Sequence, residues 1–258
     1  MKYLKNRPLA VAARPGVPLR SDLLDSPALQ RIYHFHVPHP GPFFVTPKNR
    51  DLAYTKGMAF LVDQSYLPAT LTARPMSDDE FTRLCAEHPD LSFEMTGEGD
   101  LIVMPPTYSL TGARNSEIGA QLRGWARQDG RGVVCDSSTG FVLPNGARRS
   151  PDVAWIRKDR VRQLDPESLE RYWRLCPDFV IELRSKSDRL PNLRDKMREW
   201  LANGAELGWL IDPEARSIEV YRPDREPEIL TGAKTAAGEG PVAGFVLDLG
   251  PVWNPLGV

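Results

Sequence analysis

From Ser77 onward, apolar and polar residues alternate with periods that predict a succession of helices and strands. Ser77 and Glu80 fit a capping box, and the apolar positions that follow have helical spacing, which predicts a helix over about 78–88. Two β-rich runs come next, near 91–96 and 101–104, separated by a glycine-containing turn. This arrangement predicts a hairpin.

A second helix is predicted where Ile118, Leu122 and Trp125 share one helical face, and Gly130 follows its end. The residues after it, 133–146, contain two short β-rich runs around a turn. We interpret them as a second hairpin-like pair.

The second half of the chain predicts strands on either side of one more helix. Short strands are expected at 150–156 and 179–183, a helix at about 192–203, and a clear hairpin at 207–223. This order predicts an α/β fold with a mixed sheet flanked by helices. It does not predict a doubly wound fold, because βα repeats are few and no glycine-rich phosphate loop follows a strand.

Residues 1–70 differ from the rest of the chain. Prolines are frequent there, and no periodicity persists for more than a few residues. We therefore predict a proline-rich, irregular N-terminal extension over 1–70 and a single domain over 71–258.

Composition narrows the functional classes. The formal net charge is -1, so the chain carries no overall basic signal for nucleic acid, although a local basic face remains compatible with it. Three cysteines, far apart in sequence, argue against a disulfide framework and a zinc ribbon. No apolar run is long enough for a signal peptide or a membrane span, which favours a cytoplasmic protein.

Two acidic residues occupy strands where apolar residues are expected. Asp152 stands at the start of one predicted strand, and Glu182 lies within the apolar run Phe-Val-Ile-Glu-Leu of another. A buried carboxylate must be protonated, ion-paired or metal-bound. Two strands that present such acids side by side suit a hard divalent cation, Mg²⁺ or Mn²⁺.

Two cations accompany these acids in the pattern. Arg184 shares the strand face of Glu182 because strand residues two apart point the same way. Lys196 falls on the apolar stripe of its helix, so it is expected to point inward toward an anion such as Glu182. A carboxylate-held metal beside a cation is the arrangement that phosphodiester hydrolysis needs.

Other interpretations remain open from the residues alone. A buried Glu182–Arg184 or Glu182–Lys196 ion pair could simply hold the fold together. Glu94, before the glycine turn, is a further candidate metal ligand, and Glu117 is an additional acid with a weaker case.

Several segments occur in the order found in the Uma2 family: MSDDEF, GDLIVMPPT, NSEIGAQL, SPDVAWI, CPDFVIELRSKSD and LRDKMREWLANGAELGWLIDPEARSIEVYRP. The chain closely resembles this family from about Met76 to Trp253. The resemblance implies the PD-(D/E)XK nuclease superfamily and its restriction-endonuclease-like α/β core. It also implies a Mg²⁺- or Mn²⁺-dependent endonuclease that acts on DNA.

Carried over residue by residue, Asp152 matches the aspartate of the PD element, Glu182 the following acid, and Glu94 the acid before the glycine turn. The lysine of the superfamily pattern is replaced by Arg184, and the family lysine matches Lys196 on the next helix. Lys186 stands where the family usually has proline, which adds a charge at the rim of the site.

The predicted roles follow from this correspondence. Lys196 would orient or polarise the attacking water, and Arg184 would stabilise charge electrostatically, since an arginine does not accept a proton. DNA phosphates would contact basic residues on loops beside the acids. The candidates for these contacts are Arg148, Arg149, Lys186 and Arg189.

Two alternative functions stay open at this stage. One is a nucleic-acid-binding or protein-interaction module on a nuclease scaffold without turnover, because fold alone does not establish activity. The other is an enzyme for a different phosphate substrate. The sequence also leaves the oligomeric state open, including a homodimer.

Overall fold

The computed structural model describes residues 43–44, 60–61, 68–71 and 76–257. The helices are α2 (Asp78–Glu87), α3 (Ser109–Asp129), α4 (Lys158–Val161), α5 (Pro166–Leu169), α6 (Leu190–Ala202), the 3₁₀ helix η3 (Gly240–Val242) and α7 (Gly250–Trp253). The strands up to the middle of the chain are β1 (Phe43–Phe44), β2 (Phe60–Leu61), β3 (Ala69–Leu71), β4 (Ser92–Met95), β5 (Leu101–Met104), β6 (Gly132–Asp136), β7 (Phe141–Val142) and β8 (Arg148–Arg149). The later strands are β9 (Val153–Arg157), β10 (Phe179–Leu183), β11 (Leu207–Asp212), β12 (Ser217–Tyr221), β13 (Glu228–Thr231), β14 (Thr235–Ala237) and β15 (Val246–Asp248).

A six-stranded mixed sheet forms the centre of the fold, with the strand order β13-β12-β11-β10-β9-β6. β10 runs parallel to β11, and α6 makes the crossover between them. The other neighbours in this sheet pair antiparallel. The predicted mixed sheet flanked by helices is confirmed, and so is the predicted hairpin of β11 and β12.

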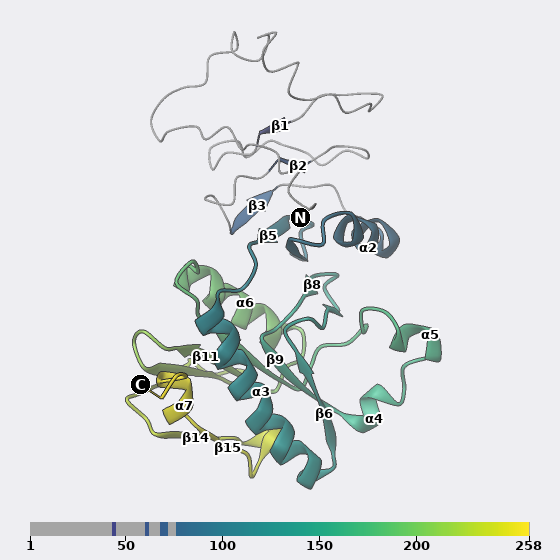
Figure 1. Cartoon of the computed structure of the whole chain (residues 1–258). Coiled ribbons are helices and arrows are strands. Elements are labelled where there is room, and N and C mark those ends of the chain that lie inside the picture. The colour runs from purple at the N-terminus through teal and green to yellow at the C-terminus, as the bar shows by residue number, and fades with distance from the viewer. Residues whose placement is uncertain (1–42, 45–59, 62–67, 72–75, 258) are drawn as a thin grey trace, which may run out of the picture.

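The two faces of this sheet are covered by different helices (Figure 1). In β10, Phe179 and Ile181 pack with α3 and with the C-terminal elements around Phe245. Val180 faces the other way and packs with Met197 and the rest of the apolar stripe of α6. Because side chains alternate along a strand, Glu182 belongs to the face that α6 covers.

A glycine in β11 lets α6 approach the sheet closely. A Cβ built on Gly208 would lie 2.4 Å from Met197 Cε and 3.4 Å from a side-chain atom of Val180. The absence of a side chain at this position therefore sets the depth at which α6 packs. That depth in turn fixes where the polar residues of α6 reach the sheet.

A second sheet of five strands, in the order β3-β5-β4-β8-β7, packs against α2. The predicted capping box is present, since Glu80 N–H donates to Ser77 Oγ and Ser77 N–H donates to Glu80 Oε2. The predicted hairpin of β4 and β5 is also confirmed. Phe93 and Met95 of β4 pack in the core beneath α2.

The prediction of a hairpin over 133–146 is wrong. β6 pairs with β9 in the six-stranded sheet, whereas β7 pairs with β8 in the five-stranded sheet. The connection turns at Asp136, whose carboxylate accepts hydrogen bonds from Ser138 N–H (3.0 Å) and from the Ser138 hydroxyl (2.5 Å). The chain therefore passes between sheets at this turn instead of folding back on itself.

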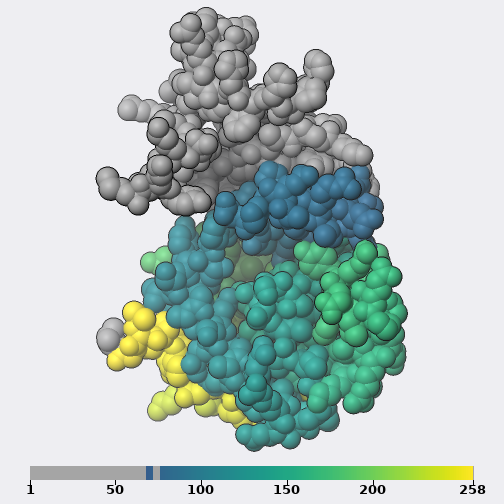
Figure 2. All heavy atoms as spheres, turned by 45° about the vertical axis from the view of Figure 1, so that its right-hand side comes forward, coloured from purple at the N-terminus to yellow at the C-terminus, as the bar shows by residue number. Residues whose placement is uncertain are grey.

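The C-terminal elements lie along α3, and Figure 2 shows these yellow residues against the teal middle of the chain. Arg114 Nε donates to the carbonyl oxygen of Val252 at 2.9 Å. Gln121 exchanges hydrogen bonds with the backbone of Asp248 at 3.0 and 2.8 Å. Apolar residues between Val242 and Trp253 thus form part of the cover on one face of the central sheet.

Most of the predicted extension over 1–70 lies outside the described residues. Within it, β1 and β2 form a two-stranded parallel pair. β3 begins at Ala69 and pairs with β5, so the five-stranded sheet starts slightly before the predicted boundary. Across the described ranges, no helix combines the length and apolar content that a membrane span requires.

Candidate functional site

A cleft of about 490 Å³ is lined by residues from both sheets, from α3 and from α6. Four acids are among the lining residues: Glu94, Asp152, Glu182 and Asp188. Lys196 is the one basic residue among the described residues that line it. The cleft is therefore rich in acidic groups, which would repel a phosphate unless cations neutralise them.

Glu182 is buried in β10, with an exposed fraction of 3%. Its Oε1 accepts a 2.8 Å hydrogen bond from Trp200 Nε1 and lies 2.9 Å from Lys196 Nζ. Burial raises the pKa of Glu182 to about 7, and the neighbouring acids Asp152 and Glu94 add to the rise although Lys196 opposes it. A carboxyl with this pKa changes between its neutral and charged forms near neutral pH.

Lys196 lies four residues before Trp200 on α6, so both side chains point to the same face of the helix. Its Nζ lies 2.8 Å from Glu94 Oε1 and donates to the carbonyl oxygen of Ser150 at 2.9 Å. Burial lowers the pKa of Lys196, but Glu182 and Glu94 outweigh it and raise that pKa above its ordinary range. Lys196 is therefore a charged ammonium that joins two carboxylates.

Glu94 comes from β4 and has an exposed fraction of 2%. It points away from the core beneath α2, because its neighbours in the strand, Phe93 and Met95, fill that core. Its carboxylate accepts from Ser150 N–H at 3.0 Å and from Arg149 at 3.0 Å. Burial acts to raise the pKa of Glu94, but the charges of Lys196 and Arg149 lower it overall, so Glu94 is ionised.

Asp152 lies directly before β9, at the start of the strand as predicted. Leu183 N–H donates to its Oδ2 at 2.7 Å, and Asn115 Nδ2 donates to its Oδ1 at 2.6 Å. Burial raises the pKa of Asp152, and Asp188 contributes to the rise. Two donors from different elements thus fix the plane of this carboxylate.

The sequence interpretation missed Asn115. It lies on α3 three residues before Ile118 and seven before Leu122, so it shares the apolar stripe of that helix. Its Oδ1 is buried and has no hydrogen-bond partner, while its Nδ2 holds Asp152. A polar residue within an apolar stripe is the same signal that identified Lys196, and it would have found Asn115.

Two predicted site residues lie apart from this cluster. Arg184 follows the end of β10 and pairs with Asp212 of β11 at 2.6 Å, and it does not line the cleft. The hydrogen bond to Asp212 raises the pKa of Arg184. Glu117 accepts a hydrogen bond from Gln121 at 2.8 Å on the part of α3 that contacts the C-terminal elements.

Arg148 and Arg149 were predicted on loops beside the acids. The loop placement is wrong, although Arg149 does contact the acid Glu94. Both lie on β8, each with an exposed fraction of 7%. Arg148 pairs with Asp78 at 2.6 Å, whereas Arg149 pairs with Glu94. Their buried guanidinium groups have carboxylate partners within the protein and face no open surface.

Lys186 and Arg189 are exposed, as predicted. They flank Ser187 and Asp188, which line the cleft. The turn that carries them is held by Asp188, whose carboxylate accepts from Ser185 N–H at 2.8 Å and from its hydroxyl at 2.7 Å. These two cations therefore stand at the rim of the acidic cleft.

The donor chemistry of the cluster fits a hard divalent cation. The carboxylates of Asp152, Glu182 and Glu94 line the cleft, and such oxygen ligands are the kind that Mg²⁺ prefers. Among the described residues, no group of three or more His, Cys, Asp or Glu side chains is arranged so that it could hold a metal ion. Mg²⁺ does not need such a group, since it is commonly held by one or two carboxylates together with waters and substrate phosphates.

Comparisons with known proteins identify the family and the fold of the chain. The family model Uma2, described as a putative restriction endonuclease, matches residues 78–250. The crystal structure of a putative nuclease belonging to DUF820 from Anabaena variabilis is similar, with 20% identity and a TM-score of 0.58. The match covers 69% of this chain and 98% of that one, and it supports the expected restriction-endonuclease-like α/β fold. No curated protein matches the chain.

Proposed function

The chain belongs to the Uma2 family of putative restriction endonucleases, and from this premise we propose that it is a metal-dependent endonuclease that hydrolyses phosphodiester bonds in DNA. The observation that carries the proposal is the position of Lys196. Its ammonium contacts Glu94 and Glu182 in a cleft that Asp152 also lines. Acids from both sheets and one lysine thus meet at a single point.

Asp152 and Glu182 would hold a Mg²⁺ or Mn²⁺ ion, with Glu94 as a further ligand. When bound, such an ion lowers the pKa of a coordinated water and neutralises charge on the phosphate. The acidic lining of the cleft supports this assignment, because the cluster has more carboxylates than cations.

The side chains of this chain have separate tasks in the proposed reaction. Leu183 N–H and Asn115 Nδ2 donate to the two oxygens of Asp152 and so fix the orientation of its carboxylate. Trp200 Nε1 donates to one oxygen of Glu182. Lys196 supplies a permanent positive charge beside the carboxylates, and its three N–H donors are directed at Glu94, Glu182 and the Ser150 carbonyl oxygen. Arg184 is not assigned a role, because its guanidinium pairs with Asp212.

DNA would be held by its phosphates at the rim of the cleft. Lys186 and Arg189 are the exposed cations beside the lining residues Ser187 and Asp188. Contacts of this kind are independent of base sequence, and they weaken as salt rises. We therefore expect the affinity for DNA to depend strongly on ionic strength.

The test is cleavage of supercoiled plasmid with Mg²⁺ or Mn²⁺. We expect cleavage by the wild-type protein and a loss of about 100-fold or more in Asp152→Asn and Glu182→Gln. Glu117→Gln is the matched control, since Glu117 is an acid outside the cleft, and its activity should be unchanged. Equal cleavage by all four proteins would refute the proposed site.

The same experiment separates the alternatives. Binding of the plasmid without cleavage by any of the proteins would identify a nucleic-acid-binding module on a nuclease scaffold. The acids and the lysine favour an enzyme, because Glu94 and Glu182 are buried charged groups, and burying them costs free energy that a binding module does not require.

A further inference from the structure

We propose that Arg149 and Glu199 are positioning residues that hold Glu94 and Lys196 in a fixed relative position. This inference rests on the proposed function, since it concerns the same site. It assigns a task to an arginine that the sequence suggested as a DNA contact and to a glutamate that the sequence did not single out.

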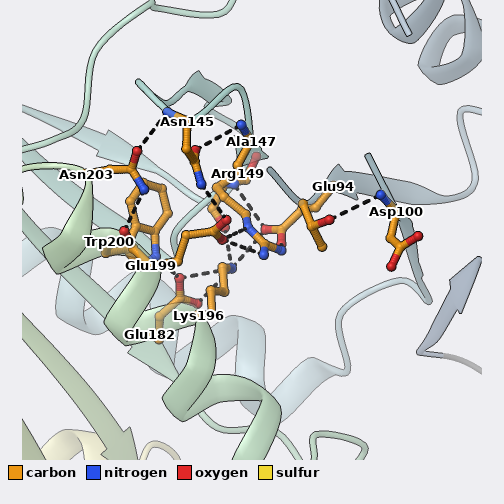
Figure 3. A network of polar contacts seen from close by, with 12 residues as sticks. Glu94, Asp100, Asn145, Ala147, Arg149, Glu182, Lys196, Glu199, Trp200 and Asn203 are labelled. Atoms are coloured by element: carbon orange, nitrogen blue, oxygen red, sulfur yellow. Dashed lines mark hydrogen bonds and ion pairs between the residues drawn. The ribbon is translucent and has the colours of Figure 1, made fainter. Parts of the chain in front are cut away.

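Arg149 stands between two carboxylates from different parts of the fold, as Figure 3 shows. Its Nη1 lies 3.0 Å from Glu94 Oε2, and its Nη2 lies 2.5 Å from Glu199 Oε2. Its Nε donates to the same Glu199 oxygen at 2.5 Å. Burial lowers the pKa of Arg149, but Glu94 and Glu199 outweigh it and raise that pKa. The guanidinium is therefore a permanent charge that bridges β4 and α6.

These contacts close a ring with the site. Lys196 and Glu199 are three residues apart on α6, so they lie on neighbouring turns of one helix face. Lys196 contacts Glu94, Glu94 contacts Arg149, and Arg149 contacts Glu199. Positive and negative charges alternate along these contacts. The backbone of α6 closes the ring, because it carries both Lys196 and Glu199.

The ring is also anchored at the turn before β8. Asn145 Nδ2 donates to Glu199 Oε1 at 3.0 Å, and the Asn145 N–H donates to Asn203 Oδ1 at 2.9 Å (Figure 3). Asn203 Nδ2 donates in turn to the carbonyl oxygen of Glu199 at 2.8 Å. The end of α6 and the strand that carries Arg149 are therefore tied together at two points.

Arg149 and Glu199 would affect the reaction indirectly, by orienting Glu94 and Lys196. Residues that orient metal ligands typically contribute about 10- to 100-fold to metal affinity or activity. Without Arg149, Glu94 would keep Lys196 and Ser150 as partners, but its orientation would no longer be fixed from the side of β8. A misplaced ligand and a shifted α6 would lower both cation binding and the rate of cleavage.

The experiment compares Arg149→Met with Arg148→Met in the full chain. The two arginines are neighbours on β8 with equal exposed fractions, and each pairs with a carboxylate, but Arg148 pairs with Asp78 on α2. The readouts are direct Mn²⁺ binding followed by electron paramagnetic resonance, kcat and KM for plasmid cleavage, and the melting temperature.

We expect both variants to melt at lower temperature than the wild type. Arg149→Met should bind Mn²⁺ about 10-fold more weakly and lose about 10- to 100-fold in kcat with little change in KM. Arg148→Met should keep the wild-type Mn²⁺ affinity, kcat and KM. Arg149→Lys should restore part of the loss, because it retains the charge but not the paired donors.

Equal Mn²⁺ affinity and equal kcat in the two Met variants would overturn the positioning role alone. If Arg149→Met does not fold, Glu199→Gln decides, since it keeps the side-chain shape and removes the charge that Arg149 contacts; wild-type affinity and kcat in that variant overturn the role. A wild-type protein that neither binds Mn²⁺ nor cleaves DNA would overturn the proposed function, and the positioning role with it.

Discussion

Trp200 donates its indole N–H to Glu182 at 2.8 Å, on the oxygen that Lys196 also contacts. The acid in the middle of an apolar strand therefore has a neutral donor and a charged one, both supplied by α6. Buried polar groups need hydrogen-bond partners, and these two donors supply them to the Glu182 carboxylate.

Replacing Trp200 by Phe should show how much the hydrogen bond from Trp200 to Glu182 contributes to the free energy of unfolding. The buried Glu182 oxygen would lose its neutral donor, which should reduce the free energy of unfolding by about 1–3 kcal/mol. Urea unfolding measures the change. Trp173→Phe is the control, since its indole donates at 3.2 Å to Leu169 at an exposed position, and a similar loss in both variants would contradict the assignment.

Glu182 should make stability depend on pH in an unusual direction. Its pKa is about 7 in the folded chain, against 4.5 for an ordinary glutamate, so the folded state binds the proton more tightly than the unfolded state does. The free energy of unfolding of the wild type, relative to Glu182→Gln, should therefore fall by up to about 3 kcal/mol as the pH rises from 4.5 to 7.

Mg²⁺ provides the control for this prediction. At pH 8 the carboxylate is ionised, and Mg²⁺ should stabilise the wild type more than Glu182→Gln, because it binds the charged form. A difference that is flat across pH would contradict the raised pKa of Glu182. An equal effect of Mg²⁺ on both proteins would contradict its assignment as a metal ligand.

Asn115 should contribute to cation binding through Asp152. In Asn115→Leu, Asp152 keeps the Leu183 N–H but loses its side-chain donor, and the unpartnered Oδ1 disappears. We expect Mn²⁺ affinity to fall about 10-fold. Gln121→Leu is a control on the same helix that contacts Asp248 instead, and calorimetric titration should show unchanged affinity in it.

Gly208→Ala should disturb the packing of α6 against the central sheet. The new methyl would meet Met197 Cε at 2.4 Å, so the helix must shift or the methionine must repack, at a cost of about 1–3 kcal/mol in unfolding free energy. Cleavage should slow as well, because Lys196 is on the same helix. In Gly124→Ala, where no atom lies within 4 Å, the protein should be as stable as the wild type or more so.

The sequence was informative wherever one element decides the direction of a side chain. The helical stripe placed Lys196 inward, strand alternation placed Glu94 opposite the core of its sheet, and the strands of Asp152 and Glu182 proved to be neighbours. The first two features depend on local periodicity, which a single sequence displays, whereas the pairing of the two strands does not.

Partners between distant elements were harder to infer. The sequence around Arg149 does not indicate that its side chain pairs with Glu94 on β4 and with Glu199 on α6. β6 and β7 looked like a hairpin because a turn separates two β-rich runs, yet each finds its partner in a different sheet. Tertiary pairing overrides the local preference in both cases.

β3 gives the chain a boundary that family resemblance does not mark. The family match begins at residue 78, but Ala69–Leu71 already pairs with β5, and Leu71 fills the core beneath α2. A protein that begins at residue 78 would lack β3, so β5 would become an edge strand with unpaired backbone N–H and C=O groups that can pair with a strand of another molecule. Such a shortened protein would tend to self-associate, so the proper unit for isolation starts before Ala69.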